Sequence, residues 1–251
     1  MSTSLIHTQL DDVEAAVGSL QGRAPEDILI YAADRYFPRI GFSTGFGPEG
    51  CVLLDLIGQL ELPIHVFTLD TGLLFPETYD LWRRLEAHTG LHIEGVRPAL
   101  TVEQQARLHG ERLWERDPDR CCLLRKVEPL REAVSGLDAW ISAIRRDQTA
   151  DRADAGVLEH DARFGLVKVN PLAAWTQDQV WDYLRANDVP FNPLHLRGYA
   201  SIGCSPCTSP VRPGEPARAG RWRERSKTEC GLHVQGSRST PGAEQEGRQG
   251  V

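Results

Sequence analysis

Short apolar runs alternate with amphipathic stretches through the middle of the chain. Runs of this length, bounded by turn residues, are typical of buried strands. Five of them are predicted as strands: Ile40–Ser43, Ile64–Leu69, Leu91–Val96, Ala139–Ile144 and Leu166–Val169. Five stretches between them have apolar residues at helical spacing and are predicted as helices: Cys51–Leu60, Glu77–His88, Val102–His109, Cys122–Val134 and Asp178–Ala186. This alternation favours parallel strands with helical crossovers, so we predict a doubly wound, mostly parallel α/β sheet flanked by helices.

The pattern also divides the chain into parts. Residues 1–35 have loosely helical apolar spacing and are predicted to pack on the outside of an α/β domain that spans residues 36–208. Residues 209–233 are rich in Gly, Pro and Arg, and we predict that they form a mobile arm. Residues 234–251 have almost no apolar side chains, so a disordered tail is predicted there.

Two loops at predicted strand ends are candidates for ligand binding. The segment Phe42–Gly50 joins a strand to a helix, and its small residues would let backbone N–H groups approach an anion. It is not a Walker A loop, because no Gly-Lys-Ser/Thr follows the glycines. The segment Leu69–Gly72 leads into a second helix in the same way. Together they favour a nucleotide site at the carboxyl edge of the sheet, although either loop alone also fits a plain connection, and Asp70 also fits a turn former.

Composition restricts the classes of protein that fit. The net charge of −7 argues against a general nucleic-acid binder, because such proteins need excess basic residues. The chain has neither a signal-like start nor an apolar stretch near the ~18 residues of a membrane span, so we predict a cytoplasmic protein without membrane contact. Its six cysteines are clustered, which favours metal binding or catalysis over a disulfide framework. A homo-oligomer is left open.

Four of the cysteines form two pairs that suit one metal centre. Cys204 and Cys207 have the two-residue spacing with which a single turn presents two sulfurs to a metal, and Cys121 and Cys122 complete a set of four. Side chains at adjacent helical positions diverge, so this vicinal pair favours a wide iron–sulfur cubane over a single zinc ion. Buried reduced thiols and a redox-active disulfide are the alternatives. Cys51 begins an apolar helix and is predicted to be a core residue.

A further cysteine, Cys230, is a candidate nucleophile. It lies in a segment, residues 209–238, that holds seven basic residues against three acidic ones in an otherwise acidic chain. Nearby cations lower the pKa of a thiol, and a thiolate on a mobile arm could reach two partners in turn. Lys126 and Arg145–Arg146 would add positive charge at the same edge of the sheet. An inert exposed cysteine on a solvated charged tail is the alternative.

Several motifs occur together in a fixed order along residues 38–233. They are LDTG with FPET (69–78), CCLLRKVEPL (121–130), AWISAIRRDQ (139–148), NPL (170–172), YASIGCSPCT (199–208), RAGRW (218–222) and ECGLH (229–233). In this combination the chain resembles the assimilatory reductases of adenylyl sulfate, the iron–sulfur branch of the phosphoadenylyl-sulfate reductase family. The resemblance implies a Rossmann-like fold of the adenine nucleotide alpha hydrolase type and a role in sulfate assimilation and cysteine biosynthesis.

The resemblance also implies a role for each matching residue. A [4Fe-4S] cluster would be held by Cys121, Cys122, Cys204 and Cys207. Cys230 would attack the sulfate sulfur, giving an S-sulfocysteine and AMP, and thioredoxin or a glutaredoxin would then release sulfite and leave a disulfide that is resolved by exchange. The phosphosulfate would be bound by Lys126, Arg218, Arg221 and His233. The nucleotide would be bound by Ser43, Leu69, Asp70, Thr71, Gly72 and Arg145.

Some residues depart from the usual pattern of this branch. The 42–50 loop is longer and closer to that of phosphoadenylyl-sulfate enzymes, so a phosphoadenylyl-sulfate or dual-specificity reductase is the main alternative. Residues 223–226 replace a common aromatic pair, and Ala143 stands where glycine is frequent. Two remoter classes are a tRNA thiolase of the same superfold, which should have an SGGxD-type loop and a basic surface, and a zinc-stapled binding domain, which would not explain ECGLH.

Overall fold

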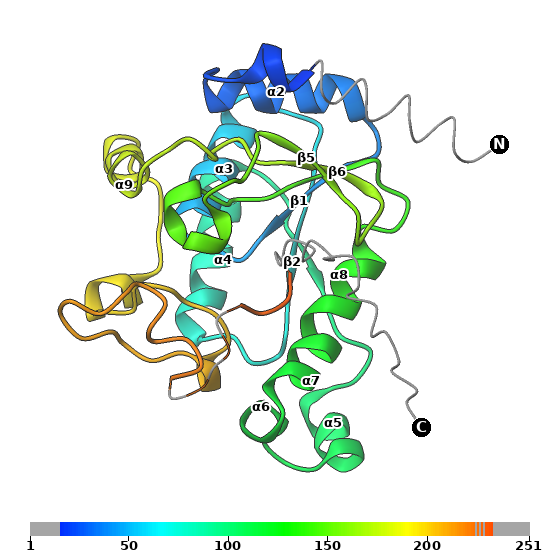
Figure 1. Cartoon of the computed structure of the whole chain (residues 1–251), viewed down its shortest axis with the longest axis vertical. Helices are drawn as coiled ribbons and strands as arrows, with labels where there is room; N and C mark the ends of the chain where they lie inside the picture. The colour runs from blue at the N-terminus through cyan, green and yellow to red at the C-terminus, as the bar shows by residue number, and fades with distance from the viewer. Residues whose placement is uncertain (1–15, 224, 226, 228, 233–251) are drawn as a thin grey trace, which may run out of the picture.

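The fold is built on one six-stranded sheet (Figure 1). The computed structural model describes residues 16–223, 225, 227 and 229–232. The strands are β1 (Ile40–Thr44), β2 (His65–Leu69), β3 (Glu94–Val96), β4 (Ala139–Ile141), β5 (Leu158–Asp161) and β6 (Leu166–Val169). Their order is β3-β2-β1-β4-β6-β5, and only β5 pairs antiparallel to its neighbour. The sheet is therefore mostly parallel, as predicted.

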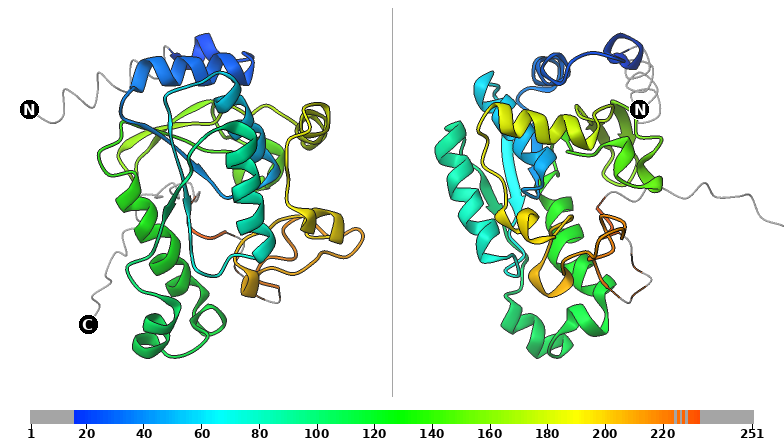
Figure 2. Two further views of the ribbon diagram at one scale, coloured as in Figure 1. Left: turned by 180° about the vertical axis from the view of Figure 1, so that it is seen from behind. Right: turned by 90° about the vertical axis from the view of Figure 1, so that its left-hand side faces the viewer.

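Helices cover both faces of this sheet (Figure 2). The α-helices are α2 (Pro25–Tyr36), α3 (Pro48–Gln59), α4 (Pro76–Thr89), α5 (Val102–His109), α6 (Leu113–Arg116), α7 (Pro118–Cys122), α8 (Glu128–Ala133) and α9 (Gln177–Ala186). Apolar residues of α2, α3, α4 and α9 share one core cluster with the sheet, whereas α8 packs on the opposite face in a second cluster. No helix among the described residues combines the length and apolarity needed to cross a bilayer.

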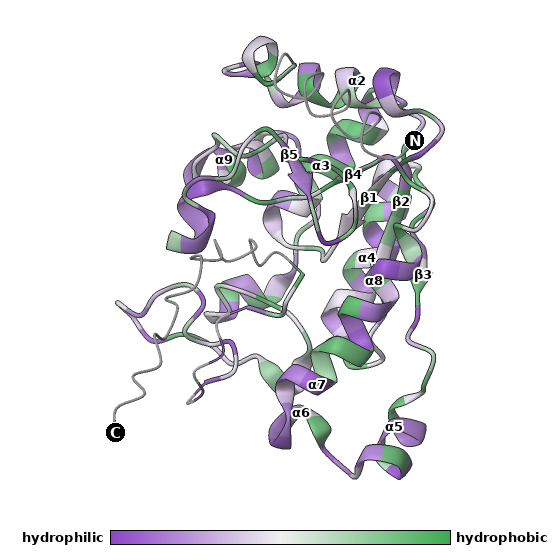
Figure 3. Cartoon of the chain, turned by 45° about the vertical axis from the view of Figure 1, so that its right-hand side comes forward, coloured by the Kyte–Doolittle hydropathy of each residue, from purple (hydrophilic) through white to green (hydrophobic). Residues whose placement is uncertain are grey.

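Alternation along the strands explains the two clusters. In β2, Val66 belongs to the first cluster and Phe67 to the second, and in β4 Ile141 and Trp140 divide in the same way. Successive side chains of a strand point to opposite faces, so a strand covered on both sides is apolar throughout. Figure 3 shows this concentration of hydrophobic residues along the central strands, while the helices carry both hydrophobic and hydrophilic faces. The second cluster, whose buried members are Phe67, Leu69, Leu130, Val134, Trp140 and Leu166, is called the α8-side cluster below.

The order of the strands reverses between β1 and β4. From β1 the chain winds outward through β2 to β3, then returns through α5 to α8 and places β4 on the other side of β1. In open sheets of this kind the two loops at the reversal diverge and leave a crevice at the carboxyl ends of the strands. The fold therefore places a binding site beyond Thr44 and Ile141.

Two differences from the predicted elements have simple causes. Strand β5 was not predicted, because its sequence Leu-Glu-His-Asp is polar, as suits an edge strand that pairs on one side only. The helix predicted over 122–134 is instead α7, a π-helical turn at Leu123–Val127 and α8. Pro129 cannot donate a hydrogen bond to the carbonyl of Arg125 four residues earlier, and the regular α-helical pattern is replaced immediately before it.

The structure describes only some of the parts into which the chain was predicted to divide. Helix α2 packs on the core through Ile28, Leu29 and Ala32. The domain bounds and the mobility of the arm at 209–233 stay predictions. Residues 1–15 and 233–251 lie outside the described residues, so the predictions for the start of the chain and for a disordered tail stay predictions.

Candidate active site

A cleft of about 680 Å³ lies at the strand reversal. It is lined by the end of β1, the first turn of α3, the loops after β2 and β4, and part of the segment after residue 200. Clefts of this size hold small-molecule ligands. Of the residues predicted to bind the substrate or to react with it, those that line the cleft are Ser43, Leu69, Thr71, Lys126, Arg145, Arg218, Arg221 and Cys230.

Asp70 and Gly72 are not among the residues that line this cleft. The buried Asp70 carboxylate accepts hydrogen bonds from the Tyr79 hydroxyl at 2.6 Å, Arg97 Nε at 3.1 Å and the Gly72 backbone N–H at 3.1 Å. Burial acts to raise the pKa of Asp70, but these hydrogen bonds lower it and the net shift is downward. These contacts match the turn-forming alternative, and direct contact of Asp70 or Gly72 with a nucleotide stays a prediction.

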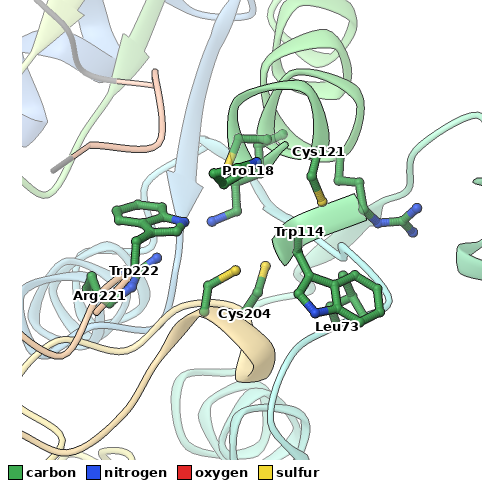
Figure 4. Close-up of a pocket in the computed structure, with 11 residues that line it drawn as sticks. Leu73, Trp114, Pro118, Cys121, Cys204, Arg221 and Trp222 are labelled. Carbon is green, nitrogen blue, oxygen red and sulfur yellow. The ribbon is translucent and has the colours of Figure 1, made fainter. Parts of the chain in front are cut away.

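The four paired cysteines line a separate pocket next to the cleft (Figure 4). Cys121 and Cys122 come from the end of α7, and Cys204 and Cys207 from a turn more than eighty positions later. Figure 4 shows Cys121 and Cys204 facing one another across the pocket, with Trp114 and Trp222 on either side. The fold thus brings together the four sulfurs that the sequence predicted as one ligand set.

Local structure explains how each pair is held. The Asp117 side chain caps α7 by accepting from the Arg120 N–H, which fixes the helical turn that carries Cys121 and Cys122. The second pair lies in a 3-10 turn whose Ser205 N–H donates to the Leu73 carbonyl at 2.7 Å. The loop after β2 therefore supports the Cys204 turn directly.

The surroundings of the sulfurs fit an iron–sulfur cluster. Thr71 Oγ1 lies 3.3 Å from Cys204 Sγ, and Gln105 Nε2 lies 3.9 Å from Cys121 Sγ. Burial raises the pKa values of Cys121, Cys122 and Cys207 to about 11, so a bound cationic centre would be needed to keep these thiols ionised. Among the described residues, no three Cys, His, Asp or Glu side chains are arranged around a single metal ion. Four thiols in two pairs match the ligand set of an iron–sulfur cluster, and the identity of the group that they hold stays a prediction.

Two buried cations, Lys126 and Arg221, separate the cysteine pocket from the cleft. Both line both cavities, and neither forms an ion pair with another described residue. The Arg221 guanidinium lies 4.5 Å above the Trp222 ring, and its Nε has no hydrogen-bond partner in the described part of the chain. Burial acts to lower the pKa of Lys126, but the sulfurs of Cys204, Cys230 and Cys122 raise it, and the net shift is upward. Buried cations without acidic partners indicate an anion site.

Cys230 lies at this anion site and is partly buried. Burial acts to raise the pKa of its thiol, but Lys126, the Leu232 backbone N–H and Arg221 lower it more, so the net shift is downward. By contrast, burial raises the pKa of the core residue Cys51. The thiol that the sequence predicted as nucleophile therefore has the environment that favours a thiolate.

Two further arginines that line the cleft are already paired. Arg145 is almost fully buried, donates from Nε to Glu49 at 2.8 Å and also pairs with Asp147. Arg218 pairs with Glu229 at 3.0 Å. Lys126 and Arg221 are thus the cleft cations left for an anion, among residues the structure describes. His233 lies outside those residues, so its predicted role stays a prediction.

Sequence reasoning missed two residues of this region. Arg152, in a 3-10 turn after β4, reaches Glu229 at 3.1 Å and lines the cleft. Glu229 was noted only as part of the ECGLH motif. Arg152 lies in a charged loop without periodicity or motif, so nothing in the sequence distinguishes it from a solvated arginine.

Comparison with known proteins agrees with this geometry. A family profile described as "Phosphoadenosine phosphosulfate reductase domain" matches residues 39–210. The adenosine 5′-phosphosulfate reductase 1 of Bacillus subtilis is 49% identical over 207 residues, which are 82% of this chain and 89% of that protein. The phosphoadenosine 5′-phosphosulfate reductase of Gloeobacter violaceus is 47% identical over 214 residues, covering 84% and 89%.

A solved structure has the same fold. The phosphoadenylyl-sulfate reductase of Candida auris, crystallised as a phosphate complex, aligns with a TM-score of 0.71 and 33% identity. The alignment covers 79% of this chain and 96% of that one. The resemblance and the fold class predicted from the sequence are both confirmed. From the cleft, the clustered cysteines and these matches we conclude that the chain belongs to the phosphoadenosine phosphosulfate reductase family.

Proposed function

We propose that this protein reduces adenylyl sulfate to sulfite and AMP, with thiols as the electron donor, in assimilatory sulfate reduction. The observation that supports this most directly is a cysteine of lowered pKa in a nucleotide-sized cleft, beside two buried cations that have no acidic partner among the described residues. The relatives named as adenosine 5′-phosphosulfate reductases support the same substrate.

In the first half-reaction the Cys230 thiolate attacks the sulfur of the sulfate group. A sulfur–sulfur bond forms, the bond between that sulfur and the phosphate oxygen breaks, and AMP leaves with the electron pair. Negative charge gathers on the sulfate and phosphate oxygens during this step, and Lys126 and Arg221 are the cations that would stabilise it first. Arg218 would add to this by turning part of its guanidinium from Glu229 toward the substrate. Lys126 and Arg221 are already buried beside Cys230 without the substrate, and charges positioned in advance lower a barrier most.

In the second half-reaction a thiolate of the reductant attacks Cys230 Sγ. The sulfur–sulfur bond breaks, sulfite leaves with its electron pair, and the enzyme and reductant are joined by a disulfide. A second thiol of the reductant then displaces Cys230 and restores its thiolate. We propose a thioredoxin or a glutaredoxin as this dithiol, and a reducing cytoplasmic location, because the described cysteines are free thiols.

The four paired cysteines would hold a [4Fe-4S] cluster next to this site. When bound, the cluster would supply a fixed centre of charge and structural rigidity, while the thiols carry out the reduction. Lys126 lines both cavities, so its ammonium group would experience the charge of the ligated sulfurs as well as that of the substrate. Arg125, 3% exposed, would support the ligands indirectly, because it donates to the Thr71 carbonyl at 2.6 Å and to Gln105 at 3.2 Å.

Phosphoadenylyl sulfate is the second candidate substrate. The relative from Gloeobacter violaceus is named for that compound, yet its identity to this chain is close to that of the relatives named for adenylyl sulfate. The two substrates differ only in a 3′-phosphate on the ribose. Arg145 in the cleft already forms ion pairs with Glu49 and Asp147. Its charge is therefore not available to a 3′-phosphate, which favours adenylyl sulfate as the substrate.

The test compares sulfite release from the two adenylated sulfates by anaerobically purified protein supplied with thioredoxin. We expect turnover of adenylyl sulfate and an SO3 adduct on Cys230 in the absence of reductant, detected by peptide mass spectrometry. The Cys230→Ser variant should give neither sulfite nor adduct while keeping the brown colour of the cluster. Undiminished turnover by that variant, or absence of any adduct in the native protein, would contradict the proposal.

A further inference from the structure

Polar contacts hold the main chain both before and after Cys230 in the sequence. Before the cysteine, Glu229 pairs with Arg152 at 3.1 Å and with Arg218 at 3.0 Å. After it, Arg163 donates one terminal N–H to the Gly231 carbonyl and another to the Leu232 carbonyl. Because carbonyls of two consecutive residues are held by one guanidinium, the main chain is fixed directly beside the nucleophile.

Arg163 belongs to neither of the two cavities. It lies in the turn between β5 and β6, where its guanidinium is 5.0 Å from the Phe164 ring centre and 3.8 Å from Asp161. These contacts orient its planar fork before the segment docks. The Leu232 side chain adds an apolar contact, because it packs against the α8-side cluster. The β5–β6 turn therefore forms a dock for residues 229–232, the segment that carries Cys230.

The chemistry requires this dock to open. The inference rests on the proposed function, in which Cys230 first attacks a substrate in the cleft and then meets a thiol of a second protein. In the docked position Cys230 is partly buried and lines the cleft with Lys126 and Arg221. A thiol on the surface of a second protein would have to enter the cleft to reach it. The polar contacts of the segment are ion pairs and hydrogen bonds at partly exposed groups, the Arg163 side chain being 32% exposed. Contacts of this kind are individually weak in water, so they can be released.

We propose that Arg152, Arg163 and Glu229 form a latch that positions Cys230, and that the latch is closed during the first half-reaction and open during the second. The closed latch favours sulfonation of Cys230 by the substrate. The open latch favours release of sulfite by the reductant. Arg163 and Glu229 are thus positioning residues, which act through the location of Cys230.

The decisive variant is Arg163→Ala, with Arg185→Ala as its matched control. Arg185 is an exposed arginine on α9 whose one ion-pair partner, within the part of the chain that the structure describes, is its helical neighbour Asp182. Two rates are measured on the cluster-loaded protein at saturating substrate: adduct formation on Cys230 without reductant, and sulfite release from the isolated adduct by thioredoxin. In Arg163→Ala the ratio of the second rate to the first should rise about tenfold, the change expected when the two individually weak carbonyl contacts of Arg163 are lost from a two-state equilibrium.

Further readouts separate positioning from a general structural defect. The substrate concentration at half-saturation should not change, because Arg163 does not line the cleft. Arg163→Lys should give an intermediate ratio, since an ammonium group can satisfy one of the two carbonyls. Glu229→Gln should raise the ratio as Arg163→Ala does. Parallel loss of both rates, or an unchanged ratio in Arg163→Ala, would overturn the latch.

Hydrogen exchange tests the latch independently of catalysis. The amides of residues 230–232 should exchange faster in Arg163→Ala than in the native protein and in Arg185→Ala, as measured by mass spectrometry. If the native protein forms no adduct, the proposed function fails, but faster exchange in Arg163→Ala would still support the latch. Equal exchange in all three proteins would refute the latch even if the native protein reduces adenylyl sulfate.

Discussion

At the scale of single residues, the environment of Cys230 depends on cations that lie far from it in the sequence. Lys126 comes from the π-helical turn and Arg221 from the loop after the second cysteine pair. Both act against the effect of burial, which by itself would raise the pKa of the Cys230 thiol. The lowered pKa of Cys230, the proposed nucleophile, therefore depends on tertiary contacts, while the chemical type of the residue comes from the sequence.

The pH dependence of Cys230 follows from the direction of this shift. Because the pKa is lowered, the thiolate persists at lower pH than in an ordinary cysteine, and reactivity is lost as the pH falls through the pKa. In Lys126→Met the pKa should rise, so the pH profile of Cys230 alkylation should move to higher pH and the rate at neutral pH should fall. Peptide mass spectrometry after iodoacetamide treatment measures this. A profile at the same pH as in the native protein would rule out the assigned role of Lys126.

At the scale of elements, loops from separate strands support one another around the two cavities. The loop after β2 contacts the Cys204 turn through Leu73 and Thr71, and the Thr208 side chain accepts from the Gly203 N–H within that turn. Gly203 is also where the Arg221 guanidinium packs, because a Cβ at this position would lie 2.3 Å from Arg221 Nη2. The shape of the turn thus determines the position of Arg221, which we propose binds the substrate.

Gly203→Ala should therefore weaken anion binding more than it weakens the fold. The displaced atoms are the end of a flexible side chain, which can move at little cost in stability. We expect the affinity for AMP, measured by calorimetry, to fall about tenfold, as when a charge-assisted hydrogen bond is lost. The control is Gly18→Ala, where an added Cβ meets nothing within 4 Å. Native affinity in Gly203→Ala would show that Arg221 does not contact the nucleotide phosphate.

Removing a single predicted cluster ligand tests the metal site. Cys204→Ser should lose the brown chromophore and sulfite formation together, because a hydroxyl is a poor ligand for iron. Metal analysis of the native protein should find iron and inorganic sulfide. Colourless native protein with one zinc ion per chain would instead support the zinc-stapled alternative.

At the scale of the whole molecule, a buried carboxylate connects three helices that pack on the same face of the sheet. Asp55 of α3 is 4% exposed and accepts hydrogen bonds from His88 of α4 at 3.0 Å and from the Tyr183 hydroxyl of α9 at 2.8 Å. Gln59 donates to the same carboxylate at 2.7 Å. This network lies apart from the cleft, so its contribution should be to stability rather than to chemistry.

Asp55→Ala should destabilise the protein by at least about 3 kcal/mol, because three hydrogen bonds to a buried charged group are lost and each is worth roughly 1.5–3 kcal/mol. Urea unfolding followed by circular dichroism measures the loss. Sulfite formation per folded molecule should remain near that of the native protein. A change below about 0.5 kcal/mol, the range of ordinary surface substitutions, would contradict the predicted role.

Much of the fold and part of the site could be predicted because they depend on local or repeating signals. Apolar runs predicted β1, β2 and β6 closely, and helical spacing predicted α5 and α9. The polar strand β5 has no such signal and is stabilised by pairing with β6. The predicted strand Ala139–Ile144 is shortened to β4 because the chain leaves the sheet after Ile141 to line the cleft.

The sequence by itself determined the chemical groups available: paired cysteines, one further thiol, a surplus of arginines near it and an alternation that forms a parallel sheet. It could not decide which arginines face the cleft and which contact the residues beside Cys230. Only the tertiary structure placed Lys126 and Arg221 between the two cavities. It also brought Arg152 and Arg163 into contact with the residues on either side of Cys230. The physical reason is that residue type and periodicity act locally, whereas electrostatic interactions depend on distances in space between groups far apart along the chain.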